Sequence, residues 1–398
     1  MVCGVDISKN SFNYCIIDNN LNKLKEGKFN LLKDDLIKFI QIVNEFNDIV
    51  VIVESTGIYH INFVSFLLEN GINVKIINPK TIKRFIDYYF ANNSSKTDKK
   101  DAFAIALFGI KNPEIVNSAN SSIPSSLKMI AREIESLSHQ KASVKTKIKA
   151  HLNILFPELE HNVDIFRKSV LNILLKFLSA KSISVTDETQ IQSIINNTNS
   201  TGKKVKFNAN DIINLAKNSI ASSNKALEIA LVNYINQLFI IENSINELSK
   251  FLEKEAEKYF KDDIDIISSI KGISKTSASK IMAEIENIDK FENFKKLIKF
   301  TGTDPVIKQS GNFKLNKSIS KQGNPHLRNF LYQATNGVIK HNPVFKNYFR
   351  KKKSQLKSFK KAVIATLNKL IRVIFGMLKN KSKFDTNFHK NNLNFNLA

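Results

Sequence analysis

Two aspartates three residues apart, Asp98 and Asp101, lie among lysines in the stretch SSKTDKKDAFAIA, residues 94–106. Side chains at positions i and i+3 share one face of a helix, so this spacing presents two carboxylates side by side. Asp6 and Glu54 are two further acids, one within and one at the end of a short apolar run. Because like charges in partial burial repel one another, four converging carboxylates indicate a site for a divalent cation. Hard oxygen ligands suit Mg²⁺ or Mn²⁺.

Two such ions, about 4 Å apart, stabilise the attacking and leaving oxygens of a phosphodiester displacement. Three of the four acids also have a plainer interpretation. Asp98 follows Ser95 at the spacing of a capping box, and acids are common in the first turn of any helix. Glu54 suits the start of a turn, whereas a lone carboxylate at Asp6 on an apolar strand is costly to bury. Taken together, the acids favour a metal site that acts on phosphodiesters.

The elements of the first third of the chain decide whether these acids meet. Alternating and continuous apolar runs predict strands, and apolar residues at helical spacing predict helices. A meander joined through a crossover helix to a parallel strand gives a mixed sheet whose first and fourth strands lie side by side. Asp6 and Glu54 then share one end of the sheet, close to the helix that carries Asp98 and Asp101. The expected strands are 2–8, 11–18, 23–30, 48–54 and 73–79, and the expected helices are 34–46 and 59–71.

The charge balance indicates a polyanionic partner. The 398 residues are 42% hydrophobic, enough for two or three domains with their own cores. Lys and Arg number 60 against 36 Asp and Glu, which gives a net charge of +24. The excess is concentrated between Lys295 and Phe384, where 22 basic residues accompany a single acid, Asp304. Such a distribution is the electrostatic footprint of a nucleic-acid-binding protein.

Cysteine content and hydropathy bear on location. Cys3 and Cys15 are the only cysteines, too few for a disulfide framework or a structural zinc site, and they fit a reducing cytoplasm. An aspartate at position 6 argues against a signal peptide. The most apolar stretch, residues 362–378, is interrupted by charged residues and predicts an amphipathic helix. We expect a cytoplasmic, nucleoid-associated protein that does not bind membranes.

The middle of the chain, residues 120–260, is predicted to be helical and to lack a catalytic motif. Residues 126–159 form one long polar helix that suits either a partner helix or a nucleic acid. Its imperfect heptads make dimerisation through a coiled coil one possibility. His139, His151 and His161 have spacings that suit no metal site and are interpreted as ordinary surface or interface residues.

Residues 266–285 predict a helix, a tight turn at Gly272 and a second helix. The pattern resembles a helix-hairpin-helix, in which the turn and the following helix N-terminus offer N–H groups to a phosphate. A plain helical hairpin within a core explains the same pattern equally well. The surrounding positive charge favours the interpretation that involves DNA.

Ser310 precedes a glycine in a polar, turn-forming segment flanked by Lys308 and Lys314. A serine in a loop is ordinary, and no His–Asp relay is evident beside it, although His326 and His341 follow. A nucleophile in this setting would need activation by a metal ion or by basic neighbours.

The motifs GVDISK, VESTGIYH, INPKTIKRF and SSKTDKKDAFAIA resemble the N-terminal DEDD domain of the IS-one-ten family of insertion-sequence transposases. The later stretches IKGISKTSASKIMAEI, SG, SKQGNPHLR and HNP resemble the C-terminal transposase domain of that family in order and spacing. These proteins are RuvC-like, RNA-guided recombinases of bacteria and archaea. One departure is GTDP at residues 302–305, where the family usually has a sequence such as GLAP.

The resemblance implies an RNase H fold, a magnesium-binding tetrad and a serine that attacks DNA to form a transient phosphoserine. It also implies donor and target DNA, a structured guide RNA and an assembly of two or four protomers as partners. The tetrad maps onto Asp6, Glu54, Asp98 and Asp101, and the nucleophile maps onto Ser310. The expected nucleic-acid contacts are Lys96, Lys99, Lys275, Lys308, Lys314, Lys321 and Arg328.

The expected architecture is therefore α/β followed by all-α. An RNase H-like mixed sheet precedes a helical or coiled-coil middle and a mainly helical C-terminal domain with a helix-hairpin-helix-like motif. The expected segments are 1–112, 120–260 and 262–380, with a disordered tail over 381–398. Two other functions compete with transposition. A RuvC-type nuclease would cleave branched DNA with the metal site alone, and a packaging protein would bind nucleic acid without catalysis.

Overall fold

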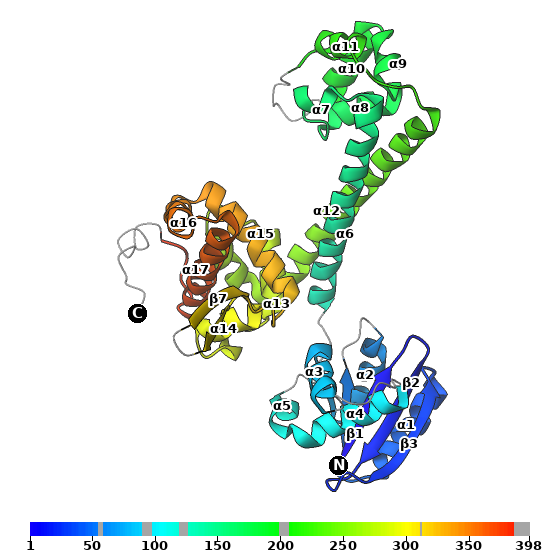
Figure 1. The fold of residues 1–398 in the computed structure, drawn as a ribbon, viewed down its shortest axis with the longest axis vertical. Helices are drawn as coiled ribbons and strands as arrows, with labels where there is room; N and C mark the ends of the chain where they lie inside the picture. The colour runs from blue at the N-terminus through cyan, green and yellow to red at the C-terminus, as the bar shows by residue number, and fades with distance from the viewer. Residues whose placement is uncertain (55–58, 90–97, 119–125, 199–206, 311–312, 386–398) are drawn as a thin grey trace. The chain divides into compact units, whose positions relative to one another are not determined.

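The computed structural model describes residues 1–54, 59–89, 98–118, 126–198, 207–310 and 313–385. The expected disordered tail falls largely on residues 386–398, outside the described residues. The chain divides into two compact units, residues 1–125 and residues 126–398. The first contains the sheet and the second contains long helices and a small hairpin (Figure 1).

The first unit is built on a five-stranded sheet with the strand order β3-β2-β1-β4-β5. The strands β1, β2 and β3 form an antiparallel meander, and β4 and β5 continue the sheet in parallel with β1. The predicted mixed sheet, with its first and fourth strands adjacent, is confirmed. Its elements are β1 (Val2–Ile7), β2 (Ser11–Ile17), β3 (Lys23–Asn30), α1 (Lys33–Asn44), β4 (Val50–Glu54), α2 (His60–Glu69), β5 (Val74–Ile77), α3 (Pro79–Tyr89), α4 (Asp98–Lys111) and α5 (Pro113–Ser118).

Helices cover both faces of this sheet, so alternate residues of the central strands enter two different cores. On one face Phe12 of β2 packs edge-on against Phe39 of α1 and Phe63 of α2. On the other face Cys15 and Ile52 join a second core with residues of α3 and α4. Figure 1 shows α4 lying along β1, and the two elements are in contact.

The second unit is organised around two long helices, α6 (Ser126–Leu155) and α12 (Lys225–Ser268), which pack along each other. The predicted long polar helix is therefore confirmed, and its helical partner belongs to the same chain. One end of the pair contributes Leu127 and Leu252 to a large core with the C-terminal helices. The other end contributes Leu152 and Leu231 to a separate core with short helices.

These short helices connect α6 to α12 and enclose the smaller core of the unit. Their aliphatic residues recur at the helical period and form the buried faces. They are α7 (Leu159–Asn162), α8 (Lys168–Phe177), α9 (Ala180–Ser184), α10 (Glu188–Thr198) and α11 (Ala209–Lys217).

The C-terminal part of the second unit is mainly helical, as predicted, but it also contains a two-stranded hairpin. Helix α12 ends at Ser268, and a turn with Gly272 at φ +108° leads into α13, so the predicted helix–turn–helix is present. Gly272 lies against the backbone of Gly337, which explains the need for a glycine. The elements are α13 (Lys275–Ile285), a 3₁₀ turn (Ile288–Lys290), α14 (Phe294–Thr301), β6 (Pro305–Ser310), β7 (Phe313–Ile319), α15 (Pro325–His341), α16 (Pro343–Leu356) and α17 (Phe359–Lys379).

Helix α17 contains the stretch that the sequence predicted to be amphipathic, and one of its faces enters the large core. Within the residues that the structure describes, no helix is long and apolar enough to span a membrane.

Candidate active site

Asp6 and Glu54 lie on neighbouring parallel strands at the same edge of the sheet. Val5 of β1 pairs in register with Val53 of β4, so the two acids are the next residues on their strands. Both side chains are half-buried. Because side chains alternate between faces, Asp6 shares the face of Gly4, which is the face that α4 covers.

Helix α4 runs antiparallel to β1 and touches it closely. A Cβ built on Gly4 would lie 2.3 Å from both the carbonyl oxygen of Ala102 and the amide nitrogen of Ala106. Further along α4, a Cβ built on Gly109 would lie 2.8 Å from Cγ1 of Val2. The helix therefore begins above the carboxyl end of β1 and ends above its amino end.

This packing brings the first turn of α4 above Asp6. Two residues of strand span about 6.6 Å, which equals the rise of four to five helical residues, or about one turn. Asp6 is two residues beyond Gly4, so the part of α4 above it carries Asp98 and Asp101. Asp101 is half-buried, whereas Asp98 opens the helix and its side chain lies outside the described set.

The environment of these acids suits negative charge. The N-terminal turn of α4 carries the positive end of the helix dipole, which stabilises nearby carboxylates. Asn13, the cross-strand neighbour of Asp6, is a buried amide on the same face. Sequence reasoning did not single out Asn13, because its burial depends on α4 covering a strand almost one hundred residues earlier.

The donor set fits a hard divalent cation, since it consists of carboxylate oxygens from two strands and one helix. Among the side chains that the structure describes, no group of three or more His, Cys, Asp or Glu residues is placed to hold a metal ion. Asp6, Glu54 and Asp101 thus do not form such a group by themselves, and the side chain of Asp98, the fourth expected ligand, lies outside the described set.

Ser310 ends β6 at the far end of the hairpin, where it pairs with Phe313 of β7. The sequence predicted a turn-forming segment here, whereas the residues up to Ser310 and from Phe313 onward are paired strands. Five residues of strand place Ser310 about 16 Å along the hairpin from Pro305. Lys308 and Lys314 lie on the same two strands. The side chains of Ser310, Lys308 and Lys314 are outside the described set.

The other predicted nucleic-acid contacts have varied surroundings. Lys275 forms an ion pair with Glu257, with 3.1 Å between Nζ and Oε1. The Arg328 guanidinium donates to the carbonyl oxygen of Thr301 at 3.0 Å, and burial lowers the pKa of Arg328. Lys321 is exposed, and its amide donates to the carbonyl of Gly302. Lys96 and the side chain of Lys99 lie outside the described part of the chain.

A histidine–carboxylate pair lies at the junction of α6 and α15. Nδ1 of His326 is 2.6 Å from Oε2 of Glu135, and Asn329 donates to the other oxygen of this carboxylate. Burial raises the pKa of Glu135, but the hydrogen bonds from His326 and Asn329 outweigh burial and leave the pKa below its usual range. No local motif identifies this pair, because its members are 191 residues apart in sequence.

A second ion pair, in which the carboxylate is buried, joins α6 to α13. Nε and Nη2 of Arg132 donate to the two carboxylate oxygens of Glu284 at 2.7 and 3.0 Å. Asn324 adds a third donor at 2.7 Å. The Glu284 side chain is fully buried, so these three donors replace water around its charge.

Comparison with known proteins agrees with these features. A DEDD transposase model matches residues 3–157, which include the sheet and α4, and a model described as transposase IS116/IS110/IS902 family matches residues 264–350. The pilin gene-inverting proteins of Moraxella bovis and Moraxella lacunata are each 21% identical over 398 residues, covering 97% of this chain and 98% of each relative. The transposase for insertion sequence element IS1111A of Coxiella burnetii is 28% identical over 129 residues, covering 31% of this chain and 35% of that protein.

The two matched regions correspond to the sheet with its acidic edge and to the helical region that contains Ser310. Together they define an enzyme that acts on DNA. The chain belongs to the IS110 family of transposases, the IS-one-ten family that its motifs resemble.

Proposed function

We propose that this protein is a site-specific DNA recombinase that moves an insertion sequence by transesterification. The observation that supports the proposal most strongly is the position of Asp6 and Glu54, in register on adjacent strands beneath the first turn of α4. A mixed sheet with carboxylates at this edge supports the proposal of an RNase H-like catalytic domain of the RuvC type.

The four acids are proposed to hold one or two divalent cations, Mg²⁺ or Mn²⁺. A bound cation would supply Lewis-acid stabilisation of the charge that develops on phosphodiester oxygens. The protein's own contribution is positional. Parallel register fixes Asp6 beside Glu54, and the close packing of Gly4 holds the turn that carries Asp98 and Asp101 above them.

Ser310 is proposed to be the nucleophile. Its Oγ loses a proton and forms a bond to a DNA phosphorus atom, while the bond from that phosphorus to one deoxyribose oxygen breaks and the leaving oxygen gains a proton. Attack by the hydroxyl of another strand reverses these changes and releases the serine. The phosphodiester bond is conserved throughout, so no nucleotide hydrolysis is needed.

Donor and target DNA are the proposed substrates, and a structured guide RNA is the proposed source of sequence selection. The net charge of +24 and the basic C-terminal region support binding of both. The curated relatives named as a transposase and as pilin gene-inverting proteins support a reaction on DNA. We also propose a dimer or tetramer that works in the cytoplasm, on the bacterial nucleoid.

The metal part of the proposal is tested with the variant Asp6→Asn, which keeps the size of the side chain and removes its charge. The matched control is Asp34→Asn, because Asp34 is exposed on α1. Calorimetric titration with Mn²⁺ and strand cleavage in Mg²⁺ are measured on both variants. We expect Asp6→Asn to lose tight binding and cleavage while Asp34→Asn keeps both. Equal Mn²⁺ affinity in the two variants would contradict the proposed metal site.

A further inference from the structure

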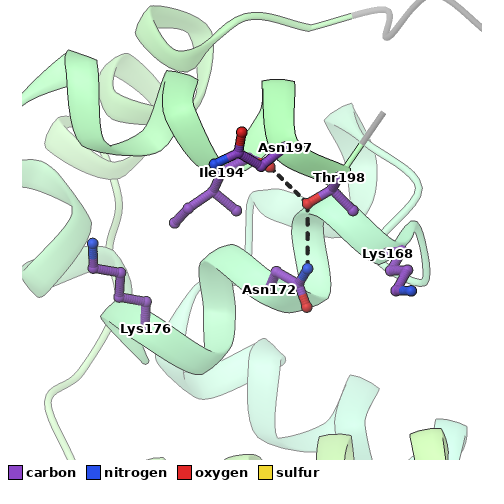
Figure 2. Close-up of a pocket in the computed structure, with 6 residues that line it drawn as sticks. All are labelled: Lys168, Asn172, Lys176, Ile194, Asn197 and Thr198. Atoms are coloured by element: carbon purple, nitrogen blue, oxygen red, sulfur yellow. Dashed lines mark hydrogen bonds between the residues drawn. The ribbon is translucent and has the colours of Figure 1, made fainter. Parts of the chain in front are cut away.

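The short helices between α6 and α12 contain a cleft of about 400 Å³ that no catalytic step uses. It lies between α8 and α10, and Figure 2 shows side chains from both helices around it. Its size is within the range of pockets that bind small organic groups. Six residues line it: Lys168, Asn172, Lys176, Ile194, Asn197 and Thr198.

The cleft has a basic border. Lys168, Asn172 and Lys176 are four residues apart on α8, so they follow one face of that helix. The two lysines are exposed and about 12 Å apart along the helix axis. Among the described residues, no acidic side chain lines the cleft. Two lysines at the ends of an acid-free cleft favour an anion at each end.

The lining of the cleft combines polar groups with an apolar side chain. Nδ2 of Asn172 donates to Oγ1 of Thr198 at 3.2 Å, and that hydroxyl donates to the carbonyl of Ile194 at 2.6 Å (Figure 2). The bonds orient Asn172 and leave its carbonyl oxygen as an acceptor. Asn197 offers a second amide, and the Ile194 side chain offers an apolar surface. Amide groups beside an apolar surface suit the edge and face of a nucleobase.

We propose that this cleft binds one unpaired nucleotide of a nucleic-acid strand, with Lys168 and Lys176 on the flanking phosphates and the amides on the base. The inference rests on the proposed function, because it takes the partner to be a nucleic acid. It adds a binding site to a region that has no catalytic residue. The strand is either a loop of the guide RNA or a displaced DNA strand, and the two are distinguished by experiment.

The test uses the full chain with Ser310→Ala in EDTA, so that binding is measured without cleavage. Fluorescence anisotropy gives the affinity for a short oligouridylate, a short oligothymidylate and a duplex at several salt concentrations. The cleft variant is Lys168→Gln with Lys176→Gln. The matched control is Lys217→Gln with Lys225→Gln, which removes two exposed lysines outside the cleft. Thermal unfolding checks that both variants are folded.

We expect the cleft variant to reduce the slope of log affinity against log salt by about 1.4, since each lost phosphate contact contributes about 0.7. If the native and variant proteins bind equally near 1 M salt, this difference in slope makes the cleft variant bind about 25-fold more weakly at about 0.1 M salt. Asn172→Asp, which has nearly the same shape, should also weaken binding because it adds a negative charge to the cleft. The control variant should change neither the salt slope nor the affinity by a comparable amount.

A loss confined to the oligouridylate identifies RNA as the ligand, and a loss confined to the oligothymidylate identifies single-stranded DNA. Equal losses of affinity in the cleft and control variants would show general electrostatic attraction and overturn the proposal. Unchanged affinity in both variants would also overturn it. So would a failure of the protein to bind either single strand. None of these results depends on the serine or the metal site. Failure of the cleft proposal is therefore distinct from failure of the recombinase proposal.

Discussion

Gly4 of β1 lies directly against the backbone of α4 at Ala102, and a Cβ at residue 4 would stand 2.3 Å from the Ala102 carbonyl oxygen. Real Cβ atoms do not approach a carbonyl oxygen this closely, so a larger residue would push the helix away from the strand. Because Asp6 is two residues from Gly4 and Asp101 directly precedes Ala102, this contact sets the spacing between two of the proposed metal ligands.

Gly4→Ala is therefore predicted to destabilise the first unit and to impair catalysis. The added methyl group overpacks the junction of α4 and β1, at a cost of about 1–3 kcal/mol in the free energy of unfolding. Chemical denaturation measures the stability, and strand cleavage measures the activity. Gly376→Ala is the control, because nothing lies within 4 Å of a Cβ at that position in α17. Similar effects of the two substitutions would contradict the role given to Gly4.

The two cysteines are predicted to be unreactive in the native protein. Cys3 and Cys15 are both fully buried. Burial raises the pKa of both thiols, that of Cys15 to about 11, so little thiolate is present at neutral pH. Thiol labelling followed by mass spectrometry should modify both residues only after unfolding.

The same labelling reports on α4. Cys15 lies in the core that α4 completes, whereas Cys3 lies in the core on the opposite face of the sheet. In Gly4→Ala we expect Cys15 to be labelled before Cys3. Labelling of Cys3 first would show that the substitution loosens the other face.

Removing only Arg132 from the Arg132–Glu284 pair is predicted to lower the free energy of unfolding substantially. Arg132→Met leaves the fully buried Glu284 carboxylate without its cation, which costs about 3–5 kcal/mol in the free energy of unfolding. Replacing both residues with Met should recover much of this loss. The comparison is Lys25→Met, which removes one member of an exposed pair with Glu45 and should cost less than about 1 kcal/mol. Denaturant unfolding of the four proteins distinguishes these outcomes.

The hydrogen bonds to Glu135 predict how stability depends on pH. The folded-state pKa of Glu135 is below its usual value, so its contribution is present above the unfolded pKa of about 4.3 and is lost as pH falls through the lower folded pKa. The stability difference between the native protein and Glu135→Gln should therefore shrink in acid. Glu133→Gln, at an exposed neighbour on α6, is the control. A difference for Glu135→Gln that stays constant down to pH values well below about 4 would contradict the assignment.

The sheet could be predicted because its signals are local. Apolar runs and period-two alternation mark its strands, and a crossover helix fixes which strands are adjacent. The sequence also predicted α6, but it did not decide whether α6 packs against another helix or lies along a nucleic acid. The partner is α12 of the same chain, a choice that depends on packing between segments about one hundred residues apart.

Local sequence patterns do not predict the polar hairpin or the polar pairs between distant helices. The strands that end at Ser310 and begin at Phe313 have few apolar residues, so their sequence predicts a turn although their backbones pair. Glu135 and His326 are an ordinary surface glutamate and histidine by sequence. Their contact exists because α6 and α15 both contribute to the large core of the second unit, and no spacing within either helix encodes it.

Ser310 is proposed to become covalently attached to DNA with the support of the carboxylate site. The most direct test is to mix the protein, Mg²⁺, the structured guide RNA and labelled donor and target DNA, then denature the mixture and separate it on a gel. We expect a protein–DNA adduct with the native protein and no adduct with Ser310→Ala or Asp98→Asn. Cleavage without an adduct, retained in Ser310→Ala and lost in Asp98→Asn, would contradict the account and identify a metal-dependent nuclease.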